Sequence, residues 1–167
     1  MKRLLSLCLI LLATSSFAST EEHNKEFITG SGFNMTKIGD IIVGTYDMIP
    51  IWAEKVCGSH IKGTYRKGTT AGEFSVLIED KKLIGRFADV TLGIAGIDKE
   101  KQIITLSVVS PQGTSTTEIR FTSEGFADGH YENMTFDFDG KIVKLQGKAC
   151  LGSTMFLSML LKGMTIL

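Results

Sequence analysis

Alternation of apolar and polar residues from His60 to about Ala149 constrains the fold of this chain more than any other feature of the sequence. A period of two is typical of β-strands that bury one face. Turns at Asp139-Gly140 and Asp128-Gly129, with four-residue loops at 111–114 and 79–82, set the strand register. The predicted pairs are Phe136 with Val143, Met134 with Leu145, Phe121 with Phe136, Ile119 with Phe138, Leu106 with Ile119, Ile104 with Phe121, Ile78 with Leu83 and Phe74 with Phe87. All of these residues share one face, and a slip of one residue would expose them, so the sequence predicts an antiparallel meander.

Segments with a helical period flank this meander. Between Thr36, a suitable N-cap, and Gly58, a suitable stop, apolar residues recur every three or four positions. Pro50 interrupts the pattern, so we expect two short helices that meet near Ile49-Pro50. After Cys150 a polar stripe on an otherwise apolar segment predicts a C-terminal amphipathic helix. The predicted strands are 60–66, 72–79, 83–95, 102–110, 115–123, 130–138 and 141–148, with a weaker one near 26–32. The expected class is α+β: a six- to seven-stranded antiparallel meander sheet with short N-terminal helices and the C-terminal helix packed on it.

The N-terminus has the pattern of a secretory signal peptide. Lys2 and Arg3 precede an apolar run, and Ser16-Phe17-Ala18 matches the small-x-small cleavage site, so residues 1–18 are expected to be removed. The apolar run is too short to span a bilayer. Residues 19–25 are polar and predict a flexible leader, and 26–167 predict a single domain. We therefore expect export to the periplasm or the extracellular space.

Two cysteines remain after this cleavage, because Cys8 leaves with the signal peptide. In an oxidising compartment Cys57 and Cys150 are most simply one disulfide. A redox pair or a metal site is the alternative, but the sequence has no CxxC motif and no nearby cluster of His and Cys.

Composition and motifs argue against several functions. The 18 Lys and Arg residues balance 18 Asp and Glu residues without a basic run, so nucleic-acid binding is not expected. The three histidines, His23, His60 and His130, have no HxxxH or HExxH spacing, and the DFDG sequence ending at Gly140 is better explained as a hairpin turn than as a calcium loop. No GxSxG nucleophile elbow is present. The sequence therefore predicts no catalytic residue, no metal and no cofactor.

The element order resembles a known superfamily. A strand, two short helices meeting at Ile49-Pro50-Ile51-Trp52, a long meander and a C-terminal helix are similar to the helix-grip fold of START-type lipid-transfer domains and the birch-pollen allergen family. The resemblance implies an apolar pocket between a curved sheet and the last helix. The candidate lining residues are Trp52, Phe121, Phe136, Phe138, Met155, Leu157 and Leu161.

These observations favour an exported, non-enzymatic protein that binds a lipid or another apolar small molecule. Methionines on the C-terminal helix, Met155, Met159 and Met164, suit a surface that accommodates variable apolar shapes, although plain core packing explains them as well. The alternative is an interaction or structural module with a solid core, bound to a protein partner through the C-terminal helix or a sheet edge. That segment holds Lys162 and is too short for a transmembrane span.

Overall fold

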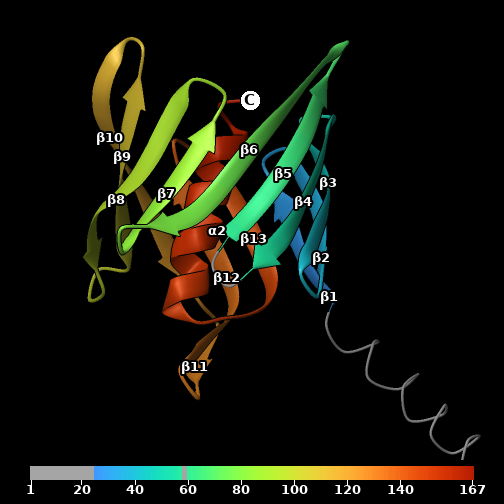
Figure 1. Cartoon of the computed structure of the whole chain (residues 1–167). Coiled ribbons are helices and arrows are strands. Elements are labelled where there is room, and N and C mark those ends of the chain that lie inside the picture. The colour runs from blue at the N-terminus through green and yellow to red at the C-terminus, as the bar shows by residue number, and fades with distance from the viewer. Residues whose placement is uncertain (1–24, 58–59) are drawn as a thin grey trace, which may run out of the picture.

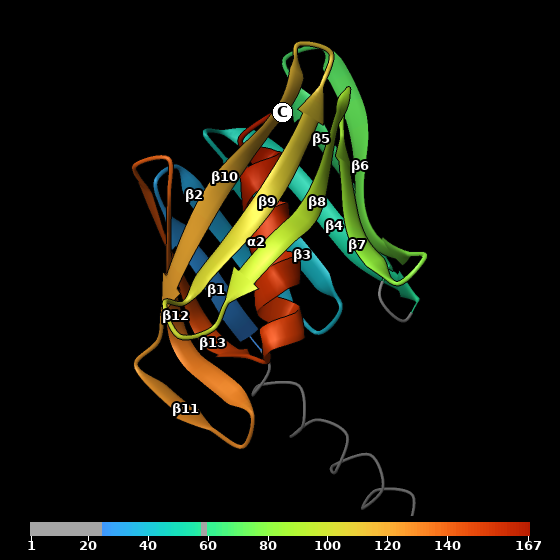
Figure 2. The ribbon, with the colours of Figure 1, turned by 90° about the vertical axis from the view of Figure 1, so that its left-hand side faces the viewer.

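The computed structural model describes residues 25–57 and 60–167 as one antiparallel sheet of 13 strands followed by a single helix. Most strands pair with their neighbours in the sequence as hairpins. The pairings of β1 with β13 and of β10 with β12 close 12 strands into a barrel (Figures 1 and 2). The short strand β11 pairs with β12 outside this barrel. The strands are β1 (Lys25–Gly30), β2 (Phe33–Ile38), β3 (Ile41–Tyr46), β4 (Ile49–Cys57), β5 (His60–Lys67), β6 (Thr70–Glu79), β7 (Lys82–Phe87), β8 (Val90–Asp98), β9 (Ile103–Ser110), β10 (Gly113–Thr122), β11 (Gly125–Ala127), β12 (His130–Phe138) and β13 (Lys141–Ala149), and the helix is α2 (Leu151–Met164). Closure leaves no long open strand edge in the ring.

The helix α2 runs through the inside of the barrel, as the two views at right angles show (Figures 1 and 2). Its first turn is exposed at Gly152 and Ser153, whereas most of the helix from Leu157 onward is buried, and Thr154, Ser158 and Met159 have 0% exposure. The main contacts of α2 are with β6 to β9, β12 and β13. A mostly apolar helix is stable in this position because the barrel wall covers most of its surface.

The predicted N-terminal helices are wrong, because residues 36–57 form the end of β2, the hairpin of β3 with β4, and the turn between β2 and β3. The segment is rich in Ile, Val, Thr and Tyr, which favour strands. Apolar residues on both faces hid the period of two: Ile42 and Ile51 are buried inside the barrel, whereas Ile41 and Val43 are exposed on its outer surface. The two sets together mimic a helical spacing.

The turn that joins β3 to β4 also gave no sequence signal. Asp47 and Met48 have φ of 45° and 65°, as in the type I′ turns that suit the twist of a hairpin. Asp80 and Lys81, between β6 and β7, have φ of 48° and 63°. Neither pair contains glycine, the residue by which such turns are normally recognised.

Within the predicted meander the expected face is correct throughout, and most of the register is confirmed. The structure confirms the pairs Phe136 with Val143, Met134 with Leu145, Phe121 with Phe136, Ile78 with Leu83 and Phe74 with Phe87. Between β9 and β10 the register is wrong by two residues: Ile119 lies opposite Ile104, because the loop contains two residues and not four. The predicted strand 83–95 is in fact two strands, which a turn at Ala88 and Asp89 separates.

The resemblance to the helix-grip fold is therefore not supported. That fold would place the last helix across one face of an open, curved sheet, whereas here the sheet closes on itself and encloses the helix. The expected open meander of six or seven strands is likewise wrong: four strands, β1 to β4, precede it, the predicted strand 83–95 is divided into β7 and β8, and β11 is an additional strand.

Candidate ligand cavity

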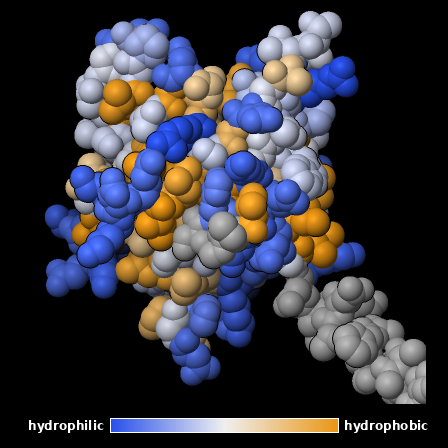
Figure 3. Space-filling view, viewed as in Figure 1, coloured by the Kyte–Doolittle hydropathy of each residue, from blue (hydrophilic) through white to orange (hydrophobic). Residues whose placement is uncertain are grey.

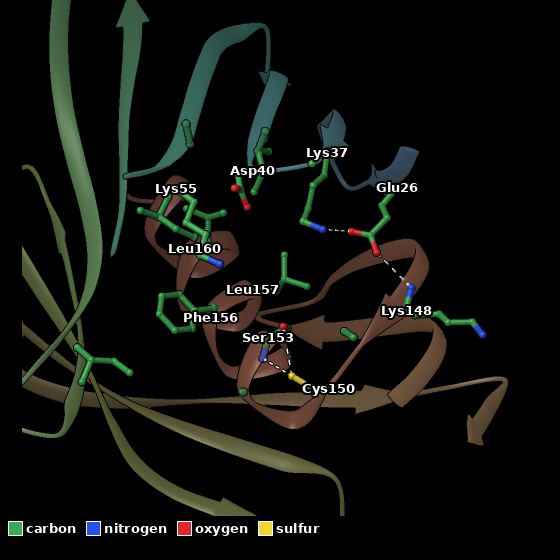
Figure 4. A pocket seen from close by; sticks show the side chains of 17 residues that line it. Glu26, Lys37, Asp40, Lys55, Lys148, Cys150, Ser153, Phe156, Leu157 and Leu160 are labelled. Atoms are coloured by element: carbon green, nitrogen blue, oxygen red, sulfur yellow. Dashed lines mark hydrogen bonds and ion pairs between the residues drawn. The ribbon is translucent and has the colours of Figure 1, made fainter. Parts of the chain in front are cut away.

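A cavity of about 470 Å³ lies between the first half of α2 and the opposite barrel wall (Figure 4). It forms because α2 packs mainly on β6 to β9, β12 and β13 and leaves the inner side of β2 to β5 less filled. The volume is within the range of small-molecule sites. The lining residues are Glu26, Lys37, Gly39, Asp40, Ile42, Ala53, Lys55, Ile61, Ile78, Lys148, Ala149, Cys150, Gly152, Ser153, Phe156, Leu157 and Leu160.

The inner walls of the cavity are apolar. The barrel contributes Ile42 and Ala53 from the inward-facing positions of β3 and β4, and these two residues lie opposite each other in the sheet. The helix contributes Phe156, Leu157 and Leu160, which point toward the cavity (Figure 4). Much of the rest of the lining is polar, and its charged residues Glu26, Lys37, Asp40 and Lys55, all of them exposed or half-buried, are here called the charged mouth.

The charged mouth occupies positions where the strand alternation continues inward. Each of three charged residues lies two positions from a buried residue on the same strand. Glu26 precedes Ile28 on β1, Lys37 follows Met35 on β2, and Lys55 follows Ala53 on β4. Glu26 and Lys37 form an ion pair, and Glu26 also accepts a hydrogen bond from the backbone N–H of Lys148 at 3.3 Å. The Lys148 side chain points away from the cavity (Figure 4) and pairs with Glu132.

Two further charges face the mouth without pairing. Asp40, on the turn between β2 and β3, and Lys55 are joined through their main chains by a hydrogen bond of 2.9 Å from the Lys55 N–H to the Asp40 carbonyl. Neither side chain forms an ion pair with another residue in the described part of the chain. Both are directed toward the cavity (Figure 4), so both can contact a molecule that enters it.

Cys150 lies at the inner edge of the mouth as the N-cap of α2. Its sulfur accepts a hydrogen bond from the Ser153 N–H at 3.5 Å and contacts the Ser153 hydroxyl at 3.4 Å. These contacts with Ser153 lower the pKa of the Cys150 thiol. The start of α2 therefore stabilises negative charge beside the cavity.

Of the seven residues predicted to line a pocket, the structure brings one, Leu157, to the cavity. The aromatic residues Phe121, Phe136 and Phe138 belong to the solid core, with exposures of 1–2%, and Leu161 is buried as well. Met155 is half-buried and outside the cavity lining. The cavity lies between the sheet and the last helix, and residues other than the predicted ones form most of its walls.

Trp52 lies on the outer surface of the barrel and lines a shallow hollow of about 560 Å³ over β4 to β7. This hollow holds charged side chains, including Glu54, Lys62, Glu73 and Arg86. The outer face of β5 to β7 faces the viewer in Figure 3, where hydrophilic residues are interspersed with small hydrophobic patches. A shallow, charged surface of this kind is a poor site for an apolar molecule.

Sequence reasoning missed the barrel-wall residues of the cavity, above all Lys37, Asp40, Ile42 and Lys55, because their segment was interpreted as helical. A period-two signal was available in the alternation from Ile49 to Lys55, where positions 51 and 53 are buried and 52 and 54 exposed. The exposed apolar residues of the same segment obscured it.

The predicted disulfide involves a side chain outside the described residues. Cys150 is half-buried and forms no disulfide with another described side chain, while only the backbone of Cys57 is described. Lys55 and Ile61, which flank Cys57 and its hairpin partner His60, line the same cavity as Cys150. The disulfide stays a prediction. The predicted signal peptide, residues 1–18, lies outside the described residues, as does the predicted leader, residues 19–25, apart from Lys25, which belongs to β1.

Within residues 25–57 and 60–167, no three His, Cys, Asp or Glu side chains gather in a way that could hold a metal ion. No helix among the described residues is long and apolar enough to cross a membrane. Comparison with protein-family models, with curated proteins and with solved structures found no match to this chain.

Proposed function

We propose that this protein is an exported, non-enzymatic binding protein that holds an apolar small molecule in the cavity between α2 and the barrel wall. The observation that carries this proposal is the cavity itself. Protein interiors are normally close-packed, and here an apolar space of about 470 Å³ stays open beside a helix that is otherwise tightly enclosed. Burial of an apolar ligand there would remove its surface and that of Phe156, Leu157 and Leu160 from water.

The alternative function, a module bound to a protein through its C-terminal helix, has less support. The barrel encloses α2, and eight of its 14 residues are buried. Of this helix only Gly152 and Ser153 in the first turn are exposed, which leaves a partner little apolar surface to contact. We therefore do not place a protein contact on α2.

Filling the cavity tests the proposal. The mature protein, freed of lipid by organic extraction, is titrated with the apolar probe N-phenyl-1-naphthylamine by isothermal calorimetry. Leu157→Trp places a larger side chain in the cavity, and Ile78→Trp adds bulk at its rim, where Ile78 is 50% exposed and substitution does not disturb the core. We expect both variants to weaken probe binding by about tenfold or more.

Ile142→Trp is the matched control, because Ile142 is 42% exposed on β13 and does not line the cavity. This variant should bind the probe as the wild type does. Circular dichroism and thermal unfolding establish that each variant is folded. Absence of probe binding by the wild-type protein, or equal binding by all folded variants, would count against the cavity as a binding site.

A further inference from the structure

Exposed apolar side chains gather on the outer surface of the first four strands. Five large ones are each 39–45% exposed there: Phe27 on β1, Ile38 on β2, Ile41 and Val43 on β3, and Trp52 on β4. Elsewhere among the described strands such residues are isolated, with one each on β6, β8, β9, β11 and β13. Part of this surface is seen at the right-hand edge of Figure 3, where hydrophobic residues lie over β2 and β3. Isolated exposed apolar residues are normal, whereas a group on adjacent strands is typical of a contact surface.

The strand register arranges the outward residues of β1 to β4 in three rows of four, here called the outer face. In strand order, the rows are Lys25, Ile38, Ile41 and Glu54; Phe27, Thr36, Val43 and Trp52; and Thr29, Asn34, Thr45 and Pro50. Lys25 and Glu54 are the only charged residues in the three rows. They have opposite signs and lie at opposite ends of one row.

These two charges lack a partner within the described residues. Both side chains are exposed, and neither forms an ion pair. Lys62, the neighbour of Glu54 on β5, does not pair with it either. Three strand spacings, about 14 Å, separate Lys25 from Glu54, which is too far for an ion pair within one chain.

A second copy of the chain supplies both missing counter-charges. A two-fold axis that runs along the strands between β2 and β3 places β1 of one copy opposite β4 of the other, as in the self-complementary interface of a symmetric dimer. Lys25 then faces Glu54 of the second copy, and Phe27 faces Trp52 of the second copy. The aliphatic Ile38 and Ile41 also face each other. Each of these contacts occurs twice.

The sizes of the side chains suit such a contact between two barrels. The outer surface of a barrel is convex, so two barrels diverge on either side of the line along which they touch. In the middle row the smaller Thr36 and Val43 lie on the two central strands, and the larger Phe27 and Trp52 lie on the two flanking strands. The flanking side chains are thus long enough to meet where the two surfaces diverge.

We propose that this protein forms a two-fold symmetric dimer through the outer face of β1 to β4, with Lys25 of each copy paired to Glu54 of the other. The cavity lies inside the barrel, so this inference does not depend on ligand binding there. The contact is small for a protein interface, and we expect a dissociation constant of about 10 µM.

Sedimentation equilibrium of the mature protein, at concentrations on both sides of about 10 µM, measures the association. The mass should change from that of a monomer to that of a dimer. Val43→Glu places an unpaired carboxylate in each half of the contact and should weaken the dimer by about 100-fold or more. Val109→Glu is the matched control, because Val109 is 47% exposed on β9, outside the outer face, and this variant should associate as the wild type does.

Reversal of the charges tests the orientation of the two copies. Lys25→Glu or Glu54→Lys alone puts like charges opposite each other and should weaken the dimer by about tenfold. The double variant restores opposite charges and should associate within about threefold of the wild type. In the wild type, a carbodiimide should join the Lys25 amine to the Glu54 carboxylate in a covalent dimer, identified by mass spectrometry of its peptides.

A protein that stays monomeric over the whole concentration range would overturn the proposal, also if the monomer binds vesicles of phosphatidylglycerol and phosphatidylethanolamine. A dimer that tolerates Val43→Glu uses another surface. A dimer that the double charge reversal fails to restore has another orientation, and either result contradicts the proposal. Circular dichroism establishes that each variant is folded. If Val43→Glu fails to fold, the charge-reversal series decides, because both of its positions are exposed.

Discussion

Small residues let α2 and the barrel wall approach each other closely. A Cβ atom at Gly163 would lie 2.1 Å from the ring of Phe87, and one at Gly85 would lie 2.8 Å from the sulfur of Met159. Phe87 is fully buried and stacked on Phe74, with ring centroids 5.3 Å apart, so it has little room to move. These contacts hold the helix against one wall and so leave the cavity open at the other.

The variant Gly163→Ala tests this close packing at the level of a single methyl group. Alanine favours helix by about 1 kcal/mol over glycine, but the clash with Phe87 should outweigh that gain and lower the free energy of unfolding by about 2 kcal/mol. Gly152→Ala is the control on the same helix, since a Cβ there would contact only the Cys150 sulfur, at an ordinary distance of 3.8 Å. Denaturant unfolding measures both variants. Equal stability of the two would show that Phe87 does not restrain the helix.

At the level of secondary structure, α2 is fixed to the strands at both ends. Near its start the buried Thr154 hydroxyl donates to the sulfur of Met134 on β12 at 3.5 Å. Near its end Lys162 forms an ion pair with Asp139, in the turn that joins β12 to β13, and Asp139 also accepts a hydrogen bond from Thr117 at 3.3 Å. The helix is thus tied to the strands by polar contacts as well as by apolar packing.

The ion pair at the end of α2 predicts a pH-dependent contribution to stability. The hydrogen bond from Lys162 lowers the pKa of the Asp139 carboxyl below its ordinary value. The ionised form therefore stabilises the folded state above the unfolded-state pKa, and this stabilisation is lost as the pH falls through the folded-state pKa. Asp139→Asn keeps a residue that suits the left-handed turn position, φ 49°, and removes only the charge.

We expect Asp139→Asn to lower the free energy of unfolding by about 1 kcal/mol at neutral pH, a modest value because the Asp139 side chain is 46% exposed. At about pH 2 the variant and the wild type should have equal stability. The control is Asp137→Asn on the same hairpin, because Asp137 forms no ion pair among the described residues. Its free energy of unfolding should equal that of the wild type at neutral pH. A stability difference that stays constant with pH would contradict the role of the charge. Denaturant unfolding over the acidic pH range is the measurement.

At the scale of the whole molecule, the barrel depends on contacts between segments far apart in the chain. β1 pairs with β13, and β10 closes the ring by pairing with β12 at Arg120, Phe121 and Thr122. Cys57 ends β4, and Cys150 precedes α2. A bond between these two cysteines would join the wall of the cavity to the helix inside the barrel.

Oxidation of the mature protein should therefore produce the Cys57–Cys150 disulfide. We expect a mass about 2 Da below that of the reduced protein, with alkylation of both thiols only after reduction. In the chain-entropy model the bond would stabilise the fold by about 4 kcal/mol, so reduction should lower the Tm. The double variant Cys57→Ser with Cys150→Ser is the control, and its Tm should not respond to reductant. Rapid alkylation of both cysteines in protein taken directly from an oxidising compartment would contradict the prediction.

Much of the strand structure was accessible from the sequence because it is local. Alternation with a period of two, combined with the Asp128-Gly129 and Asp139-Gly140 turns, determined which face of the meander is buried and paired Phe136 with both Val143 and Phe121. The apolar character of the last helix also follows from its residues. The segment from Thr36 to Cys57 was misassigned because its apolar residues lie on both faces and its Asp47-Met48 turn lacks glycine.

Closure, and the cavity that depends on it, were decided by the tertiary structure. A strand pattern is the same in an open sheet and in a barrel, since it records only which side chains face inward. Whether β10 meets β12 depends on the twist and stagger summed over all the strands. The same holds for Lys55, whose inward direction has chemical meaning only because α2 lies inside the ring and leaves a space beside it. The sequence by itself thus determined the strands of the meander and the last helix, and long-range packing determined that the sheet encloses the helix.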